Sequence, residues 1–250
     1  MSELVTAAMV VIGDEILSGR TKDRNIGHLA DMLTAVGIDL REVRIVSDDE
    51  AAIVEAVNAL RARNTYVFTT GGIGPTHDDI TADSIARAFD RPCGYDDKAY
   101  RLLEKHYAGR DIEFSNARKR MARMPEGAEH INNPISAAPG FRVENVYVMA
   151  GVPAIFQAML DNVVPTLRAG VKLISETIPS PLPEGAIGGP LGEIQAAHPE
   201  TIIGSYPKYR DGSFWTEIVV RSRSETALAA AVKAVGTMLE AMPPRQVAKG

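Results

Sequence analysis

Apolar positions along the chain alternate between two kinds of spacing. Short runs rich in β-branched residues are typical of buried strands. Between them, apolar residues recur every three or four positions, which is typical of helices that cover a sheet. The pattern predicts strands at Val5–Ile12, Asp39–Val46 and Tyr66–Thr70, and helices at Asn25–Val36, Asp49–Arg61 and Ile80–Phe89.

This alternation of strand and helix predicts an α/β fold, with a mainly parallel sheet and helices on both of its faces. A late strand at Tyr147–Ala150 and a helix at Ala154–Leu167 should complete the first domain, over residues 1–170. A helical pair, Asp96–Tyr107 and Asn116–Met124, interrupts the pattern before them and is interpreted as an insertion.

The composition changes after residue 178, where prolines and glycines cluster between Pro179 and Pro190. Such a tract is typical of a linker or an extended loop. The remaining pattern predicts a small α/β domain over residues 171–250. Its expected elements are a strand within Lys172–Ile178, a short helix at Leu191–Ala197, a strand at Ile202–Tyr206, a turn at Asp211–Gly212, a strand at Phe214–Val220 and a final long helix.

Candidate chemistry gathers where the predicted strands end. In an open parallel sheet, ligands bind beyond the carboxyl ends of the strands. Four segments fall at such ends, namely Gly13–Gly19, Ser47–Asp49, Thr69–Thr81 and Gly151–Pro153. We therefore expect these segments to meet around one ligand.

The third segment has the strongest pattern. Gly71, Gly72 and Gly74 lack a Cβ, so their N–H groups can approach an anion, and the following helix directs its positive end to the same place. Asp78 and Asp79 would repel a phosphate unless a divalent metal, of which Mg²⁺ suits oxygen ligands best, lay between them. The alternative is a tight turn in which one of the two aspartates caps the helix.

The other acidic candidates have simpler explanations as well. Asp14 and Glu15 fit either a ligand site or a solvated turn, and Asp48 fits either a site or a helix cap. His77 fits a base, a ligand or an ordinary loop residue. The one cysteine, Cys93, excludes an internal disulfide and a cysteine metal cluster, and we expect an inert thiol there.

The charge and composition of the chain argue against two classes of binding partner, nucleic acids and membranes. A net charge of −5 argues against non-specific nucleic-acid binding, which needs a basic face. No apolar stretch is long enough to span a membrane, and the first residues lack the basic start of a signal peptide. We expect a cytoplasmic protein that binds a phosphorylated small molecule, without nucleic acid or membrane as partner.

The segment Thr70–Thr81, which reads TGGIGPTHDDIT, resembles a signature of the competence/damage-inducible protein A (CinA) family, within the MoaB/Mog-type molybdopterin-binding proteins. Gly13–Gly19 with Asn25, and the run Asn133–Phe141, resemble other motifs of that family. Gly204–Lys208 resembles a segment of the family's small domain. The likeness extends from about Val10 to the last helix.

The resemblance implies a three-layer αβα domain and a homo-oligomer. It implies functional roles for Asp79 and Asp48. The residues themselves lead us to expect a metal at Asp14, Asp78 and Asp79, and phosphate binding in the loop that contains Thr70, Gly71, Gly72, Gly74 and Thr81. Further ligand contacts would come from Glu15, Asn25, Pro139, Gly140, Gly151 and Pro153. The implied ligand is a molybdopterin or an ADP-containing dinucleotide such as ADP-ribose or FAD.

Three functions are compatible with this likeness. They are Mg²⁺-dependent hydrolysis of a pyrophosphate bond, molybdopterin binding without turnover, and adenylyl transfer to molybdopterin in molybdenum cofactor biosynthesis. This chain departs from the family where a glutamate is usual, because Ile155 stands there, and Ser136 replaces a glycine. The loss of acid at Ile155 favours binding without turnover, whereas the Asp78–Asp79 pair favours an enzyme.

Overall fold

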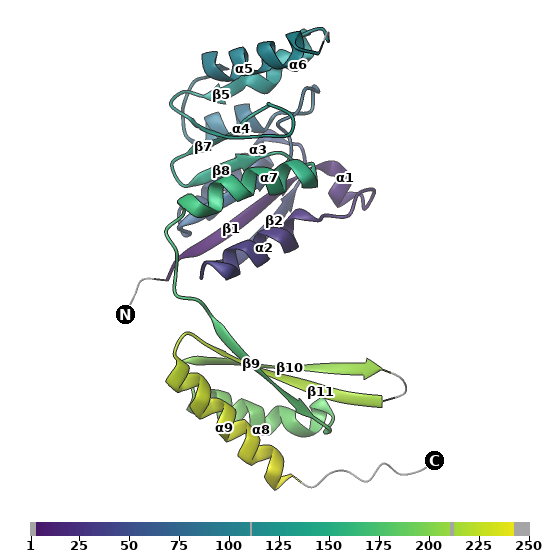
Figure 1. The fold of residues 1–250 in the computed structure, drawn as a ribbon, viewed down its shortest axis with the longest axis vertical. Coiled ribbons are helices and arrows are strands. Elements are labelled where there is room, and N and C mark those ends of the chain that lie inside the picture. Colours follow the sequence, from purple (N-terminus) through teal and green to yellow (C-terminus); the bar gives the residue numbers. More distant parts are fainter. Residues whose placement is uncertain (1–3, 111, 211–212, 243–250) are drawn as a thin grey trace. The chain divides into compact units, whose positions relative to one another are not determined.

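The computed structural model describes residues 4–110, 112–210 and 213–242. The chain divides into two compact units, Met1–Gly170 and Val171–Gly250, which Figure 1 shows as ribbons. Among the described residues, no helix combines the length and the apolar character that crossing a membrane requires.

The first unit is built on a sheet of strand order β2-β1-β3-β8-β7-β6. Four neighbouring strands, β2, β1, β3 and β8, are parallel to one another. Strand β7 is antiparallel to both β8 and β6. The predicted mainly parallel sheet is therefore confirmed. The strands are β1 (Thr6–Ile12), β2 (Asp39–Val46), β3 (Tyr66–Thr70), β6 (Glu129–Ile131), β7 (Gly140–Val143) and β8 (Val146–Met149).

Helices cover both faces of this sheet, giving three layers. Leu33 of α2 and Phe156 of α7 pack on one face, and Ile53 of α3 and Ile85 of α4 pack on the other. The alternating side chains of β1 are buried on both faces, which explains its unbroken apolar run. The helices are α1 (Asp14–Leu17), α2 (Asn25–Ala35), α3 (Glu50–Arg61), α4 (Thr81–Ala88), α5 (Asp97–Ala108), α6 (Asn116–Lys119) and α7 (Pro153–Val163), with 3-10 turns η1 (Arg120–Ala122) and η2 (Val164–Thr166).

The inserted segment differs from the predicted helical pair. Its first helix, α5, is present, but the second ends in η1, and the chain then enters a short strand, β5 (Arg123–Pro125). This strand pairs antiparallel with β4 (Cys93–Tyr95). In this pairing the backbone N–H and C=O groups of β5 form hydrogen bonds with β4, in place of the helical hydrogen bonds of the predicted helix.

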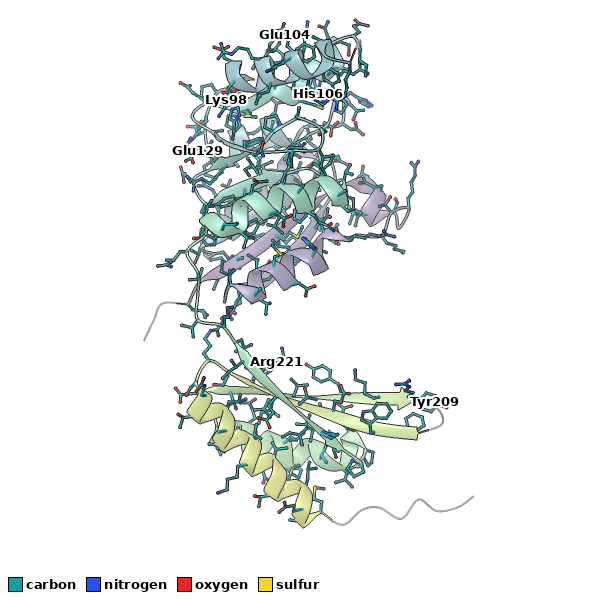
Figure 2. All side chains as sticks on the ribbon, in the orientation of Figure 1. Lys98, Glu104, His106, Glu129, Tyr209 and Arg221 are labelled. Atoms are coloured by element: carbon teal, nitrogen blue, oxygen red, sulfur yellow. The ribbon has the colours of Figure 1, made fainter. Side chains whose placement is uncertain are left out.

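The second unit has a three-stranded sheet of order β10-β11-β9, with α8 and α9 packed on one of its faces. Its elements are β9 (Ile174–Ser180), α8 (Glu184–Ala197), β10 (Thr201–Arg210), β11 (Ser213–Ser222) and α9 (Glu225–Ala241). Tyr209 and Arg221 lie toward opposite ends of the hairpin of β10 and β11 (Figure 2). The predicted turn at Asp211–Gly212 lies outside the described residues.

The interpretation of the proline- and glycine-rich tract as a linker was wrong. Most of it belongs to α8, which contains Pro190 in its interior. The helix persists because Ile187 and Leu191 are buried against α9 and the sheet, so tertiary packing outweighs weak helix propensity. The last helix begins at Glu225, and the Ser224 hydroxyl caps it by accepting the N–H of Ala227 at 3.2 Å.

Candidate functional site

A cavity of about 520 Å³ opens at the carboxyl ends of the parallel strands. The register places Ile12 beside Val46, Val11 beside Thr70, and Thr70 beside Met149, so the loops that follow β1, β2, β3 and β8 start at one edge of the sheet. The lining residues are Ile12, Gly13, Glu15, Thr21, Asp48, Gly71–Pro75, Asp78, Asp79, Met121, Asn133, Ser136, Ala138, Ala150–Pro153 and Ile155.

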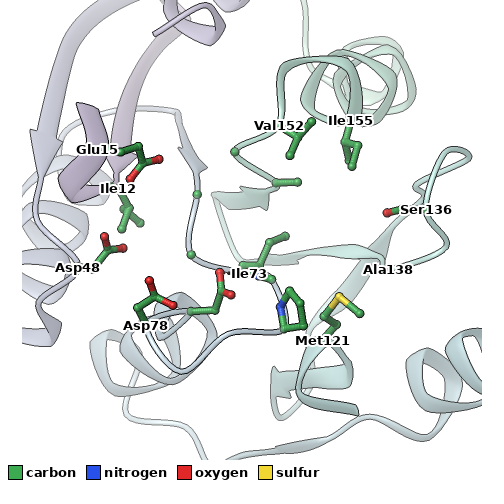
Figure 3. A pocket seen from close by; sticks show the side chains of 18 of the residues that line it. Ile12, Glu15, Asp48, Ile73, Asp78, Met121, Ser136, Ala138, Val152 and Ile155 are labelled. Atoms are coloured by element: carbon green, nitrogen blue, oxygen red, sulfur yellow. Dashed lines mark hydrogen bonds between the residues drawn. The ribbon is translucent and has the colours of Figure 1, made fainter. Parts of the chain in front are cut away.

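One side of the cavity is acidic. The carboxylates of Glu15, Asp48 and Asp78 face it from α1, from the loop after β2 and from the glycine-rich loop (Figure 3). Within the part of the chain that the structure describes, no lysine or arginine lines the cavity. This side therefore attracts cations and repels an anion that arrives without one.

The opposite side is apolar. Ile73, Met121, Val152 and Ile155 present their side chains there, with the hydroxyl of Ser136 beside them (Figure 3). Flat heteroaromatic rings bury well against such a surface, because most of their faces are apolar and only their edges need hydrogen bonds. The two sides together suit a ligand with a ring at one end and charge at the other.

The glycine-rich loop forms the wall between these sides. Gly71 and Gly72 have φ angles of +104° and +67°, which favour glycine. A Cβ on Gly71 would lie 2.1 Å from the carbonyl oxygen of Ile12, and one on Gly72 would lie 2.1 Å from Oγ1 of Thr81. Both glycines are therefore required by the packing of the loop itself, and not only by the approach of a ligand.

Two adjacent backbone donors at the start of this loop remain available. The N–H of Gly71 donates to Met149 O at 3.2 Å, and that of Gly74 donates to Asp79 at 2.7 Å. Among the described residues, the N–H groups of Gly72 and Ile73 have no hydrogen-bond acceptor. Adjacent free N–H groups before a helix N-terminus are typical of an anion site.

Both carboxylate oxygens of Asp79 accept hydrogen bonds from within the loop. Oδ1 accepts the N–H of Gly74, and Oδ2 accepts the N–H and the hydroxyl of Thr76 at 2.7 and 2.5 Å. The helix α4 begins after Ile80 with no side-chain cap, so the alternative of a capping aspartate was wrong. Asp79 holds the loop closed, and its oxygens are already occupied by three donors.

Asp48 and Asp78 have pKa values that move in opposite directions. Burial raises the pKa of Asp48, and the charges of Asp14, Glu15 and Asp78 raise it further, against the lowering effect of the Asp14 N–H, which donates at 3.0 Å. Hydrogen bonding by the Thr76 side chain and by its own N–H lowers the pKa of the exposed Asp78.

Opposite shifts in neighbouring carboxyl groups separate their roles. Asp48 holds a proton more readily than an ordinary aspartate, whereas Asp78 stays charged. The cap of α3 is Asp49, which accepts the N–H of Ala52 at 2.9 Å, so Asp48 is not needed for capping.

A buried network of hydrogen bonds connects the segments that follow β3 and β8 with the start of α2. Nδ2 of Asn25 donates to Thr70 Oγ1 and to Gly151 O, both at 2.9 Å, and Thr70 Oγ1 donates to Ala150 O at 3.0 Å. Asn25 and Thr70 are buried, so they position the cavity wall and do not line it. Thr81 has the same kind of role, because its buried hydroxyl donates to Gly71 O at 3.0 Å.

The remaining site candidates divide between the cavity and its surroundings. Glu15, Gly151 and Pro153 line it, whereas Asp14 contributes its backbone N–H to Asp48. Pro139 lines a separate small cavity behind the loop, and Gly140 starts β7, where a Cβ would lie 2.4 Å from Val148 O. His77 is exposed and does not line the cavity, and burial raises the pKa of the Cys93 thiol to about 11, as expected of an inert cysteine.

Sequence reasoning missed the apolar side. Met121 and Ile73 carry no chemical signal in a sequence, and Ser136 and Asn133 reach the cavity through a loop that the strand pattern did not predict. Asn133 shapes that loop, donating from Nδ2 to Ser136 Oγ and to Ala138 O at 2.6 and 2.8 Å. The resemblance of the run Asn133–Phe141 was the one available signal.

The acidic side offers carboxylate oxygens, which are the ligands that a divalent cation such as Mg²⁺ prefers. Among the described residues, no three histidine, cysteine, aspartate or glutamate side chains lie close enough together to hold a metal by themselves. Mg²⁺ needs only one or two protein carboxylates when phosphate and water supply the rest. Asp78 and Glu15 fit that smaller requirement, whereas the occupied carboxylate of Asp79 does not.

Residues 8–169 match a protein family described as "Probable molybdopterin binding domain", and residues 172–245 match one described as "FAD synthase, middle domain". A protein of Archaeoglobus fulgidus is 34% identical over 200 residues, which cover 80% of this chain and 85% of that protein. A CinA-like protein of Desulfosudis oleivorans is 36% identical over 204 residues, covering 77% of this chain and 49% of that protein.

Among solved structures, the chain is similar to the protein CinA of Thermoplasma acidophilum, which is described as having unknown function. The TM-score is 0.59, with 31% sequence identity, covering 63% of this chain and 95% of that one.

Proposed function

The chain belongs to the CinA-type family of molybdopterin-binding domains, and we propose that its cavity binds a phosphorylated small molecule with a heteroaromatic ring and hydrolyses its pyrophosphate bond. The ring would pack on the apolar side, and a phosphate would accept the N–H groups of Gly72 and Ile73. A molybdopterin or an ADP-containing dinucleotide has both parts.

The observation that carries this proposal is the combination, around one cavity, of two N–H groups without an acceptor, four carboxylates and, among the described residues, no basic side chain. A divalent cation, when bound at Asp78 and Glu15, would neutralise phosphate charge. Without it, the carboxylates would oppose a phosphate in the same cavity.

Asp48 is the candidate general base. Its raised pKa makes it a better proton acceptor than an ordinary aspartate, and it faces the cavity. The Asp48 carboxylate would take the proton of a water molecule while the water oxygen bonds to phosphorus. The bridging P–O bond would break, and its electron pair would leave with the departing phosphate.

Binding without turnover is the second candidate. Two features favour it, namely the apolar Ile155 on the cavity wall and the carboxylate of Asp79, which is fully engaged within the loop. Both reduce the number of carboxylates that can serve a reaction.

Calorimetry and product analysis separate these functions. ADP-ribose, FAD and molybdopterin with ATP would be presented to the wild type and to Asp48→Asn, each with Mg²⁺ and with EDTA. Mg²⁺-dependent release of a monophosphate by the wild type, lost in Asp48→Asn while binding persists, supports hydrolysis. Binding by both proteins without product supports the second candidate, and no binding by either rejects the assignment of the cavity.

A further inference from the structure

Arg120 lies directly behind the glycine-rich loop. A second cavity, of about 10 Å³, is lined by Gly72, Gly74 and Asp79 on the loop side and by Arg120 and Arg123 on the other. The same three loop residues also line the main cavity. The loop is therefore a wall one residue thick, with the proposed phosphate position on one side and a guanidinium on the other.

The two arginines behind this wall differ in their partners. Arg123 forms an ion pair with Asp83. Arg120 donates from Nη2 to the carbonyl oxygen of Asp79 at 3.3 Å, and its Nε is buried without an acceptor among the described residues. No carboxylate of the described residues lies within ion-pair distance of Arg120.

A partly buried guanidinium without a carboxylate partner costs free energy, because it has lost water and gained no opposite charge at close range. The charge still acts on its surroundings. Burial has the largest single effect and raises the pKa of Asp83, but the hydrogen bond and charge of Arg123, the hydrogen bond of Cys93 and the charge of Arg120 together lower it. The field of Arg120 thus reaches the first turn of α4, where the loop ends.

We propose that Arg120 is the positioning residue of the phosphate site: it anchors the loop through Asp79 O and supplies, from behind, the positive charge that the cavity lining lacks. This inference rests on the proposed function of the cavity. A phosphate held by the N–H groups of Gly72 and Ile73 would lie across the loop from this charge. Its attraction would offset part of the repulsion from Asp48 and Asp78.

Three variants test this role. Arg120→Gln removes the charge, Arg120→Lys keeps it, and Arg118→Gln is the matched control, since Arg118 lies two positions away and also donates to a backbone carbonyl, that of Glu113. Binding of inorganic pyrophosphate and of ADP-ribose would be measured by calorimetry with Mg²⁺. Hydrogen–deuterium exchange of residues 72–80 would be measured in the full chain without ligand.

Arg120→Gln should weaken binding of both probes by on the order of tenfold and accelerate exchange in the loop. Arg120→Lys should recover most of the binding, and Arg118→Gln should change neither measurement. A purely structural role would be shown by faster exchange with unchanged binding, or by equal losses in the Gln and Lys variants, and either result would overturn the electrostatic role.

Failure of the proposed function can be distinguished from failure of this inference. If the wild type binds neither probe, the assignment of the cavity fails, and the exchange experiment alone decides whether Arg120 anchors the loop. If the wild type binds and Arg120→Gln binds equally well, the cavity assignment stands and the role of Arg120 is rejected.

Discussion

The carboxylate of Asp79 accepts the backbone N–H of Gly74, five residues earlier in the chain, at 2.7 Å. With the two bonds from Thr76, this contact closes the loop into a compact turn that contains Gly74 and Thr76. Asp79 therefore acts on the site through backbone geometry, which changes what its substitution should do.

Asp79→Asn should destabilise the protein by about 1–3 kcal/mol, because a carboxamide offers one acceptor where three donors converge. Ligand binding should weaken with and without Mg²⁺, since the loop itself relaxes. Chemical denaturation and calorimetry measure the two effects, and Asp78→Asn is the control, because Asp78 is exposed and should leave stability nearly unchanged. A stable Asp79→Asn protein that loses only Mg²⁺-dependent binding would identify Asp79 as a metal ligand instead.

Asp48→Asn should abolish hydrolysis and yet stabilise the protein at neutral pH. The folded-state pKa of Asp48 is raised, so its ionisation opposes folding once the pH exceeds that pKa. The stabilisation by asparagine should therefore be present at neutral pH and disappear as the pH falls through the raised pKa toward the usual aspartate value. Thermal melts across this range would show it, and an Asp48→Asn protein that is less stable at pH 7 would contradict the assigned shift.

Gly72→Ala should destabilise the protein by about 1–3 kcal/mol, through both the positive φ angle and the contact with Thr81 Oγ1. The double variant Gly72→Ala/Thr81→Ala should be more stable than the sum of the single changes indicates, because it removes the clashing oxygen. Gly27→Ala is the control. Its Cβ meets nothing within 4 Å in α2, so it should stabilise by about 0.5–1 kcal/mol. Strict additivity in urea denaturation would argue that Thr81 is not the obstacle.

Ile155→Glu should change the affinity of the cavity for two ligands in opposite directions. A carboxylate on the apolar wall should weaken binding of the ring-containing ADP-ribose, whereas the affinity for Mg²⁺ alone should rise because another oxygen ligand is present. Ile155→Leu keeps the apolar character and should behave as the wild type. If glutamate leaves ring binding unaltered in calorimetry, the ring does not pack on this wall.

Residues 1–170 expressed alone should fold and bind the same ligand as the full chain. All cavity-lining residues lie before Gly170, and the first unit has its own two-sided core. Circular dichroism tests the fold and calorimetry tests the binding. A folded fragment with at least tenfold weaker binding would show that residues beyond 170 contribute to the site.

The sequence predicted the elements whose burial is periodic. The strands from Thr6 to Thr70 and the helices between them followed from apolar spacing, because each buries a face with a fixed period. The strands β6 and β7 were not predicted, since three or four residues are too few to establish a period. The helix α8 was misinterpreted, because its glycines and Pro190 signal a loop and only the burial of Ile187 and Leu191 reveals the helix.

Residues at the site were predictable to the extent that they carry a chemical signal. Asp48, Asp78 and the glycines were found because strand ends converge in a parallel sheet. The difference between Asp78 and Asp79 was not predictable, because it depends on which carboxylate the loop folds around. Arg120 was missed because nothing in its neighbourhood along the chain connects it with a loop some forty positions earlier.

The strand order determines when each strand of the first sheet can pair with its neighbours during synthesis of the chain. Strand β1 is made first but lies between β2 and β3, and β3 must wait for β8 as its other neighbour. The wall that carries Val152 and Ile155 follows β8 in the chain. The hydrogen bond from Asn25 to Gly151 can form only after this segment has been made. The acidic loops of a nascent chain therefore lack their apolar wall until the first residues of α7 have been made.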